Sequence, residues 1–147
     1  MNQIHILLVE DNEGDIFLTT EALNEGKIVN KVSIARDGKE ALDFLEKKGD
    51  FENTELPDLI LLDINLPRIN GHEVLRYIKE NVQLKLIPVI MLTTSSSEKD
   101  INQAYANSAS SYNTKPFEMV DFMDSIAKIE DFGISIVKVT TKKSYYQ

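Results

Sequence analysis

The stretch Ile4-His-Ile-Leu-Leu-Val-Glu-Asp11 is a short run of mostly branched apolar residues that stops at two adjacent carboxylates. The stretch Leu59-Ile-Leu-Leu-Asp63 has the same form, with one acid at its end. Such nearly continuous apolar runs are typical of strands that are buried on both faces of a parallel sheet. If the two strands lie side by side, the carboxylates of Glu10, Asp11 and Asp63 meet at one edge of the sheet, where open α/β sheets bind ligands.

Similar apolar runs alternate with amphipathic stretches along most of the chain, which is the pattern of a parallel sheet with helices on both faces. We therefore expect one doubly wound α/β domain with a five-stranded parallel sheet. The predicted strands span Ile4 to Val9, Lys31 to Ala35, Leu59 to Asp63, Ile87 to Thr93 and Ser110 to Asn113. The predicted helices span Gly14 to Glu25, Lys39 to Lys47, His72 to Asn81, Glu98 to Asn107 and Phe117 to Ile129.

Three of the predicted helices are preceded by residues whose side chains can accept hydrogen bonds from the first helical turn. Each of these residues is followed three positions later by a glutamate, as in a capping box. The pairs are Asp37 with Glu40, Asn70 with Glu73, and Ser95 with Glu98. Between the second helix and the third strand, Gly49 to Pro57 is polar and rich in turn formers, so we expect a loop there, away from the acidic cluster.

Length and composition limit the classes of function that the chain can serve. Its 147 residues suit a single compact domain, and without cysteine it can form neither disulfides nor thiolate ligands. We expect His5 to pack or lie at a strand edge and His72 to begin a solvent-facing helix, and neither to bind a metal. The formal net charge of −8 at pH 7 opposes binding to nucleic acid or to an anionic membrane. The sequence has no signal or membrane-spanning pattern, so we expect a soluble, cytoplasmic protein.

Polar residues that follow the other strands are expected at the same edge of the sheet. They are Asn65, Thr93 with Thr94, and Lys115 before Pro116. Mg²⁺ prefers oxygen ligands, and a bound cation relieves the repulsion between clustered carboxylates. The Asp63 carboxylate could then attack a phosphoryl group and form an aspartyl phosphate, while Lys115 and the Thr93 hydroxyl stabilise the transferred charge.

Taken singly, these residues have simpler interpretations. Glu10 and Asp11 could be an acidic pair at the start of a helix, where the macrodipole favours negative charge. Asp63 could form a turn, Thr93 could be an ordinary strand residue, and Lys115 could end a loop. Their combination in one order favours the magnesium site.

The order of these residues resembles the receiver domain of two-component response regulators. The motifs that carry the resemblance are Glu10-Asp11, Asp63-Ile-Asn-Leu-Pro67 with Gly71, Thr93, Tyr112, and Lys115-Pro116-Phe117. The resemblance covers about residues 4 to 130 and implies a flavodoxin-like fold with the strand order 2-1-3-4-5. It also implies a receiver domain over residues 1–130, followed by a C-terminal extension over residues 131–147.

The resemblance implies that Asp63 accepts a phosphoryl group from a histidine kinase or a phosphotransfer protein. The same resemblance implies that Mg²⁺ is held by Glu10, Asp11 and Asp63 together with the backbone carbonyl of Asn65. A protein of this kind catalyses its own phosphorylation and dephosphorylation and is not an enzyme that acts on a separate substrate.

Three further residues receive roles from the resemblance. Thr93 and Lys115 would contact the phosphoryl oxygens, and Thr93 with Tyr112 would form a switch that reshapes the surface of the fourth helix, fifth strand and fifth helix for a downstream protein. Tyr112 could instead be an edge aromatic that packs for stability. The chain differs from many receivers before Tyr112, where Asn107-Ser-Ala-Ser-Ser lacks glycine, and it has Ser95 two positions beyond Thr93.

The end of the chain carries a closer resemblance. Glu130-Asp131-Phe132, together with the loop Gly49 to Pro57, is similar to the stand-alone regulators related to the cyanobacterial phytochrome response regulators, which tend to lack an output domain. After Ile129, 18 residues remain, too few for an independent output domain. Their β-prone patch, Ile134 to Val139, either docks on its own domain or helps to form a homodimer.

Three alternatives compete with a phosphorylated receiver. A phosphatase of the haloacid dehalogenase kind needs a second aspartate two residues after its nucleophile, but that position is Asn65. A flavin-binding domain needs a phosphate-binding loop rich in Gly, Ser or Thr after the first strand, and none is present there. A receiver that works without phosphorylation is disfavoured by the complete set of acids.

Overall fold

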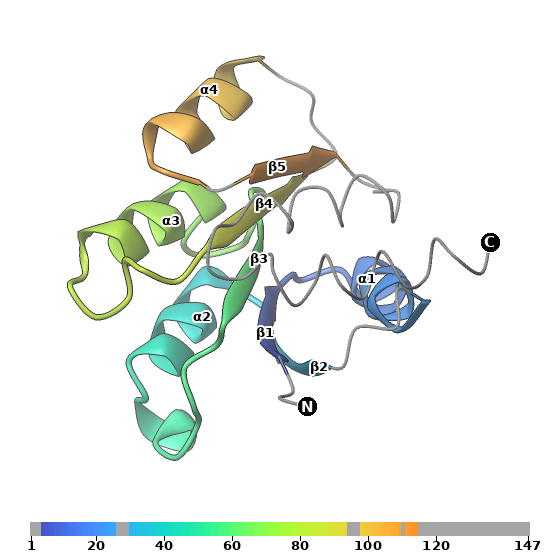
Figure 1. Cartoon of the computed structure of the whole chain (residues 1–147), viewed down its shortest axis with the longest axis vertical. Helices are drawn as coiled ribbons and strands as arrows, with labels where there is room; N and C mark the ends of the chain where they lie inside the picture. The colour runs from blue at the N-terminus through green and yellow to red at the C-terminus, as the bar shows by residue number, and fades with distance from the viewer. Residues whose placement is uncertain (1–3, 26–29, 94–97, 110, 115–147) are drawn as a thin grey trace, which may run out of the picture.

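The computed structural model describes residues 4–25, 30–93, 98–109 and 111–114, and it shows a parallel sheet between helices (Figure 1). The strands are β1 (Ile4–Val9), β2 (Asn30–Ala35), β3 (Leu59–Asp63), β4 (Val89–Thr93) and β5 (Ser111–Thr114), in the order β2-β1-β3-β4-β5. The helices are α1 (Glu13–Glu25), α2 (Gly38–Leu45), α3 (Gly71–Glu80) and α4 (Glu98–Ala106). The predicted class, an α/β protein with a parallel sheet, is confirmed.

The strand order reverses between β1 and β3, because β2 lies on one side of β1 and the later strands lie on the other. Val9 of β1 is in register with Leu62 of β3, so Glu10 and Asp63 follow that pair at the same edge of the sheet. Asp63 is in turn in register with Leu92 of β4. Glu10, directly after β1, and Asp63, the last residue of β3, therefore lie at the point where ligands bind to open α/β sheets.

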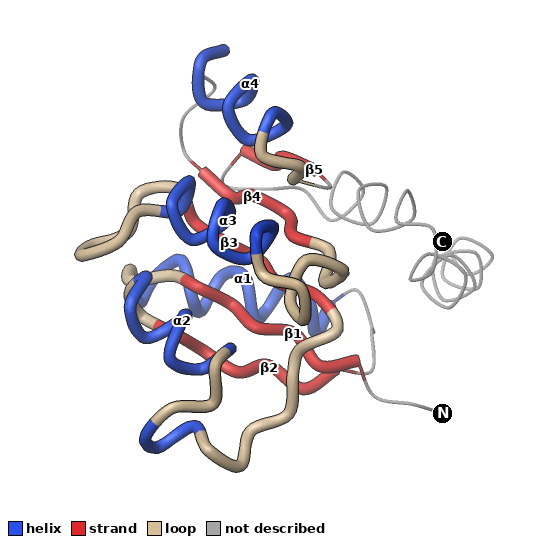
Figure 2. Tube along the Cα trace, turned by 90° about the vertical axis from the view of Figure 1, so that its left-hand side faces the viewer, coloured by secondary structure: helices blue, strands red, loops and turns tan. Residues whose placement is uncertain are grey.

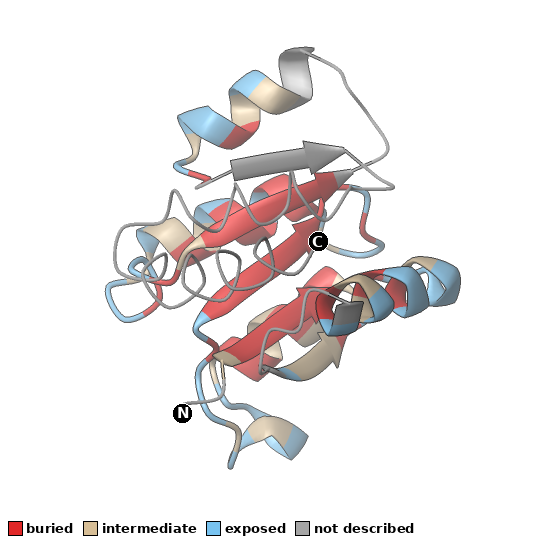
Figure 3. Cartoon of the chain, turned by 45° about the vertical axis from the view of Figure 1, so that its right-hand side comes forward, coloured by how far each residue is buried: buried red, intermediate tan, exposed pale blue. Residues whose placement is uncertain are grey.

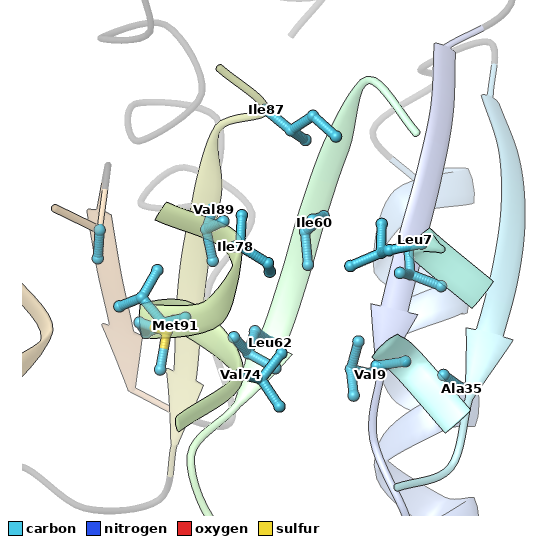
Figure 4. Close-up of a cluster of buried hydrophobic side chains, with 14 of the residues drawn as sticks. Leu7, Val9, Ala35, Ile60, Leu62, Val74, Ile78, Ile87, Val89 and Met91 are labelled. Carbon is cyan, nitrogen blue, oxygen red and sulfur yellow. The ribbon is translucent and has the colours of Figure 1, made fainter. Parts of the chain in front are cut away.

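Side chains of the central strands alternate between two apolar layers, and this alternation holds the helices on both faces. One layer packs Leu7, Ile60, Leu62, Val89 and Met91 against α2 and α3, as Figure 4 shows for part of the cluster. The other layer joins Ile6, Leu8, Leu61 and Leu92 to Ile16 and Leu23 of α1. Figure 2 shows α2 and α3 on one side of the sheet and α1 on the other.

The central strands β1 and β3 are buried from His5 to Val9 and from Leu59 to Asp63, whereas the helices expose their outer faces (Figure 3). Each residue of β3 is buried, which agrees with an apolar run that shows no polar alternation. Asp63 is the one ionisable residue of this apolar strand, and it is the last residue of the strand.

Two of the predicted helix caps are confirmed, and they place each helix start one residue earlier than predicted. The Asp37 carboxylate accepts a hydrogen bond from the Glu40 amide at 2.7 Å, and α2 begins at Gly38. The Asn70 side chain accepts from the Glu73 amide at 3.0 Å and donates to the Glu73 carboxylate at 3.0 Å. The Ser95 cap lies outside the described residues.

Two predictions about strand and loop boundaries are corrected by the structure. The fourth strand begins at Val89 and not at Ile87, because the Ile87 amide donates to the Leu84 carbonyl in a turn and Pro88 has no amide hydrogen to donate. The loop from Gly49 to Pro57 contains a 3₁₀ helix at Gly49–Phe51. Phe51 packs on Phe44 of α2, with ring centroids 5.4 Å apart, and this contact fixes the turn.

The predicted loop does lie at the edge of the sheet opposite to the acidic residues. Asp58, which follows it, accepts a hydrogen bond from the His5 amide at 2.8 Å and donates its own amide to the His5 carbonyl at 2.7 Å. His5 is near the start of β1, whereas Glu10 follows its end.

The histidine predictions have different outcomes. His5 packs as predicted: its ring is buried, its Nε2 lies 2.8 Å from Ser33 Oγ, and it meets Phe44 edge-on. His72 does not face solvent, because it lies on the inner face of α3 with only 7% of its surface exposed. The prediction was wrong because the polar pair His72-Glu73 suggested an outer helix face, whereas His72 lies one turn before the buried Leu75 on the inner face.

The predicted helix at Phe117 to Ile129 and the extension at 131–147 lie outside the described residues, so both stay predictions. Among the helices that the structure describes, none combines the length and apolar composition needed to cross a membrane.

Candidate metal and phosphoryl-acceptor site

Glu10 is the first residue after β1 and is almost completely buried, with 1% of its surface exposed. Its amide donates to the carbonyl of Ala35 at 2.9 Å, which extends the pairing of β1 with β2 by one residue. Its Oε2 accepts a hydrogen bond from the Asn12 amide at 3.3 Å. A buried carboxylate costs free energy unless polar or cationic groups stabilise it, and the Asn12 amide is one such polar group.

Asp11 and Asn12 connect this strand end to α1. Asp11 is exposed. The Asn12 side chain accepts from the Asp15 amide at 2.9 Å, and the Asn12 carbonyl accepts from the Ile16 amide, so Asn12 caps the helix. The cap fixes the short link between β1 and α1 and thereby limits the positions that the Asp11 carboxylate can take. Sequence reasoning missed this cap, although an asparagine directly before Glu13 was a visible signal.

Asp63 is the last residue of β3 and is 5% exposed. Its Oδ1 accepts a hydrogen bond from the Asn65 amide at 3.2 Å. The Ile64 amide donates to the Leu92 carbonyl of β4, so the chain stays in the sheet for one more residue before it turns. Asn65 itself is exposed, and its backbone follows directly on the acceptor candidate.

The structure brings together the three acids that the sequence predicts at the edge of the sheet. One carboxylate oxygen from each of Glu10, Asp11 and Asp63 can be chosen so that all lie within 4.8 Å of one another. Two oxygens bound to one Mg²⁺ at about 2.1 Å lie at most about 4.2 Å apart. The upper bound of 4.8 Å lies only slightly above this value. The spacing and the hard oxygen donors therefore fit a divalent ion such as Mg²⁺.

The remaining predicted site residues can be placed only in part. Thr93 is the last residue of β4, one position beyond the Leu92 that pairs with Asp63, so its backbone lies at the same edge. Tyr112 lies in β5 and is in register with Met91. Nothing is described of the side chains of Thr93 and Tyr112, and Lys115 lies outside the described residues.

Charged side chains lie around the rim of the acidic edge. Arg36 at the end of β2 forms an ion pair with Glu13 of α1 at 3.1 Å. Arg68, in the loop between β3 and α3, places its Nε 3.9 Å from Asp37 Oδ2. The Arg36–Glu13 pair is exposed and the Arg68–Asp37 pair is long, so each contributes little to stability, but together they link the loops that surround the site.

Comparison with known proteins places this fold and site in a family. The response regulator receiver domain family matches residues 6–127. The response regulator Rcp1 of Synechocystis sp. is 43% identical over 132 residues, which cover 90% of each chain. This chain therefore belongs to the response regulator receiver domain family and is a signalling protein of two-component systems.

Solved structures agree with this assignment. The bacteriophytochrome response regulator RtBRR superposes with a TM-score of 0.80 at 43% identity, over 87% of this chain and 78% of that one. The phosphorylated cyanobacterial phytochrome response regulator RcpA gives a TM-score of 0.77 at 42% identity, over 91% and 96%. The Mn²⁺-bound form of Rcp1 gives 0.74 at 43% identity, over 88% and 93%. The flavodoxin-like receiver fold is thus confirmed, and one relative binds a divalent metal.

Proposed function

We propose that this protein accepts a phosphoryl group on Asp63 in the presence of Mg²⁺ and relays the signal to another protein. The observation that carries the proposal is the meeting of three carboxylates, from Glu10, Asp11 and Asp63, within 4.8 Å. Asp63 ends a buried strand, and its Oδ1 accepts a hydrogen bond from the Asn65 amide at 3.2 Å, which orients the carboxylate. Such positioning is most of what phosphoryl transfer requires of a protein.

In the proposed reaction, an Asp63 carboxylate oxygen attacks the phosphorus atom of a phosphorylated histidine on a kinase or phosphotransfer protein. The new bond joins this oxygen to phosphorus, and the bond from phosphorus to the donor breaks with its electron pair leaving on the donor. Asp63 needs no general base for this step, because an ionised carboxylate has no proton to lose. Hydrolysis of the aspartyl phosphate by water returns the protein to its starting state.

The proposed metal ligands are the carboxylates of Glu10, Asp11 and Asp63 with the backbone carbonyl of Asn65. When bound, Mg²⁺ supplies positive charge that offsets the carboxylates and the incoming phosphoryl oxygens. The Asn65 amide holds Asp63 Oδ1 at 3.2 Å and so orients the acceptor carboxylate. The relatives support this proposal, since one is described as phosphorylated and another as Mn²⁺-bound.

Thr93 and Lys115 complete the proposed site by contacting the phosphoryl oxygens. The transferred group brings about −1.5 to −2 charges into a cluster that is already acidic. A cationic Lys115 and the Thr93 hydroxyl would offset that charge, and Tyr112 would then fill the space that Thr93 leaves. The resulting change in the surface of α4, β5 and the following segment is the proposed output to a downstream protein.

The formal net charge of −8 argues against a direct role in binding nucleic acid or membranes. We therefore propose proteins as the partners on both sides of the relay: a histidine kinase or phosphotransfer protein as donor, and an unidentified protein as target. A cytoplasmic location and a homodimer through the C-terminal extension stay predictions.

The experiment is an intact-mass measurement after incubation with acetyl phosphate, a small phosphoryl donor. We expect the mass of one added phosphoryl group with Mg²⁺ and no added mass with a chelator. Asp63→Asn, which keeps the shape but removes the nucleophile, should show no added mass under either condition.

An exposed acid at the opposite edge of the sheet provides the matched control. Asp50→Asn removes one carboxylate far from the site, so it should be phosphorylated as the wild type is. A wild-type protein that gains no mass, although it binds Mg²⁺, would contradict the proposal. A phosphoryl group that persists in Asp63→Asn would contradict the assignment of the acceptor.

A further inference from the structure

Gly38, the first residue of α2, is buried against the loop that connects β3 to α3. A Cβ atom at this position would overlap the carbonyl oxygen of Ile69 and would lie 2.8 Å from both the Ile69 carbonyl carbon and the Ile69 Cβ. Real Cβ atoms essentially never come within 3.0 Å of such neighbours. The backbone of the loop can therefore lie directly on α2 only because residue 38 has no side chain.

The same loop is held on its other side by Gly71, the first residue of α3. A Cβ atom there would overlap the carbonyl oxygen of Asp63 and would lie 2.6 Å from the Ile64 Cα. The Gly71 amide donates to the Ile64 carbonyl at 2.8 Å, which closes the loop at its base. Two glycines thus leave room for the loop between α2 and α3, and the loop has little freedom to shift.

Arg68 adds a third constraint on this loop. It adopts a positive φ of 68°, which is unfavourable for a side chain larger than glycine. In this conformation its Nε lies 3.9 Å from Oδ2 of Asp37, and Asp37 is the residue that caps α2. The loop is therefore joined to the start of α2 by backbone packing at Gly38 and by charge at Asp37.

The position of this loop determines the geometry of the proposed metal site. Asn65 lies in it, its amide holds Asp63 Oδ1, and its carbonyl is a proposed ligand. Metal ligands must keep their distances to within about 0.2 Å, and Mg²⁺ tolerates distortion of its octahedron poorly. A Cβ atom at residue 38 would push the backbone at Ile69 away. If this shift spreads along the short loop to Asn65, it exceeds the tolerance of the metal site.

We propose that Gly38 is a positioning residue for the divalent-ion site, and that it acts by seating the β3–α3 loop on the start of α2. This inference rests on the proposed function, because it concerns the ion that the acidic residues would hold. Gly38 does not touch the ion or the phosphoryl group. Its effect is on the affinity for the ion and reaches the chemistry only through that affinity.

The experiment compares Mn²⁺ binding by Gly38→Ala and by wild-type protein, with titration calorimetry on the full chain. We expect at least tenfold weaker Mn²⁺ binding by Gly38→Ala. We also expect phosphorylation by acetyl phosphate to require a correspondingly higher Mg²⁺ concentration for half-maximal rate, while the rate at saturating Mg²⁺ stays close to that of wild type. An effect confined to helix propensity would not weaken binding, because alanine is the better helix former.

Gly49→Ala is the matched control. Gly49 has a positive φ of 57° and no neighbour within 4 Å of an added Cβ, so this substitution strains the backbone without touching the site. It should lower the unfolding temperature and leave Mn²⁺ affinity unchanged. Wild-type affinity in Gly38→Ala would overturn the proposal, as would an equal loss of affinity in Gly49→Ala.

A second variant tests the same junction, between the β3–α3 loop and the start of α2, if Gly38→Ala does not fold. Asp37→Ser keeps a side chain that can cap α2 but removes the partner of Arg68, so we expect two- to threefold weaker Mn²⁺ binding. Unchanged affinity in this variant would then overturn the proposal. Asp11→Asn separates the two levels of inference: a wild type that binds Mn²⁺ no better than Asp11→Asn would contradict the metal site itself, whereas normal binding in both wild type and Gly38→Ala contradicts only the role of Gly38.

Discussion

Asp63 combines two properties that oppose each other at the level of a single residue. It ends a strand whose every residue is buried, and it carries an ionisable group within reach of two other carboxylates. Like charges this close repel one another, and a divalent ion bound between them would offset that repulsion. The Asn65 amide donates to Asp63 Oδ1 at 3.2 Å, and the proposed Mg²⁺ would add positive charge beside it. If the proposed ion binds here, it would act on both the stability of the fold and the reactivity of Asp63.

Lys79 offers a test of side-chain energetics away from the site. Its Nζ donates to the carbonyls of Lys85 and Ile87, at 3.2 and 3.1 Å, and closes the turn between α3 and β4. Lys79→Met keeps most of the apolar stem but removes both hydrogen bonds. Because Lys79 is half-buried, we expect the free energy of unfolding to fall by about 1–2 kcal/mol, measured by urea denaturation. A loss below about 0.3 kcal/mol would contradict this account.

The effect of Lys79 should also depend on pH. Burial lowers the pKa of Lys79 below its ordinary value of 10.5, so the folded protein releases this proton at lower pH than the unfolded chain does. Between the two pKa values the unfolded state binds more protons, and stability therefore rises with pH. The stability difference between wild type and Lys79→Met should be larger at pH 10 than at pH 7. A difference that shrinks over this range would show that desolvation is not the dominant effect.

At the level of elements, the sequence predicted the strand bounds and helix caps that depend on residues close together in the chain. The runs Ile4–Val9 and Leu59–Asp63 have the predicted bounds, because a strand buried on both faces leaves an unbroken apolar stretch. The caps at Asp37 and Asn70 were visible for the same local reason. The clustering of Glu10, Asp11 and Asp63 could also be predicted, because these acids stand at the ends of two strands that were expected to be adjacent in the sheet.

Features that depend on contacts distant in sequence were missed. The packing of Gly38 on Ile69 joins segments about thirty residues apart and has no local signal. His72 was expected outside because its neighbour Glu73 is polar, but it lies on the inner face of α3 and is 7% exposed. Tertiary contacts decide each of these cases.

The cap at Asn70 gives an element-level prediction. Asn70 and Glu73 form two hydrogen bonds with each other at the start of α3. Asn70→Ala removes the acceptor for the Glu73 amide. We expect a loss of about 1 kcal/mol in the free energy of unfolding, with Asn70→Asp retaining most of it, as measured by chemical denaturation. Equal stability of Asn70→Ala and wild type would show that solvent satisfies this amide equally well.

The whole molecule is acidic, and its proposed ion site couples folding to metal binding. The formal net charge is −8, and the three clustered acids add local repulsion to the folded state. A ligand that binds only the folded state stabilises it by mass action. The acids lie at the ends of β1 and β3, where the strand order reverses. The folded protein should therefore become more stable when the ion is present.

Mg²⁺ at about one hundred times its dissociation constant should raise the free energy of unfolding by about 2.7 kcal/mol. The gain should be much smaller in Asp11→Asn, an exposed position whose substitution costs little else, and intact in Asp50→Asn. Urea denaturation with and without Mg²⁺ at constant ionic strength measures the difference. The same gain in Asp11→Asn as in wild type would remove Asp11 from the ligand set.

The most direct test of the central claim is to locate the phosphoryl group chemically. Borohydride reduces an aspartyl phosphate to homoserine, so the phosphorylated protein would be reduced, digested and sequenced by mass spectrometry. We expect homoserine at position 63 in samples treated with acetyl phosphate and Mg²⁺, and unchanged aspartate at that position in samples treated with a chelator. Homoserine at Asp11 or at another acid, with residue 63 unmodified, would contradict the claim that Asp63 is the phosphoryl acceptor.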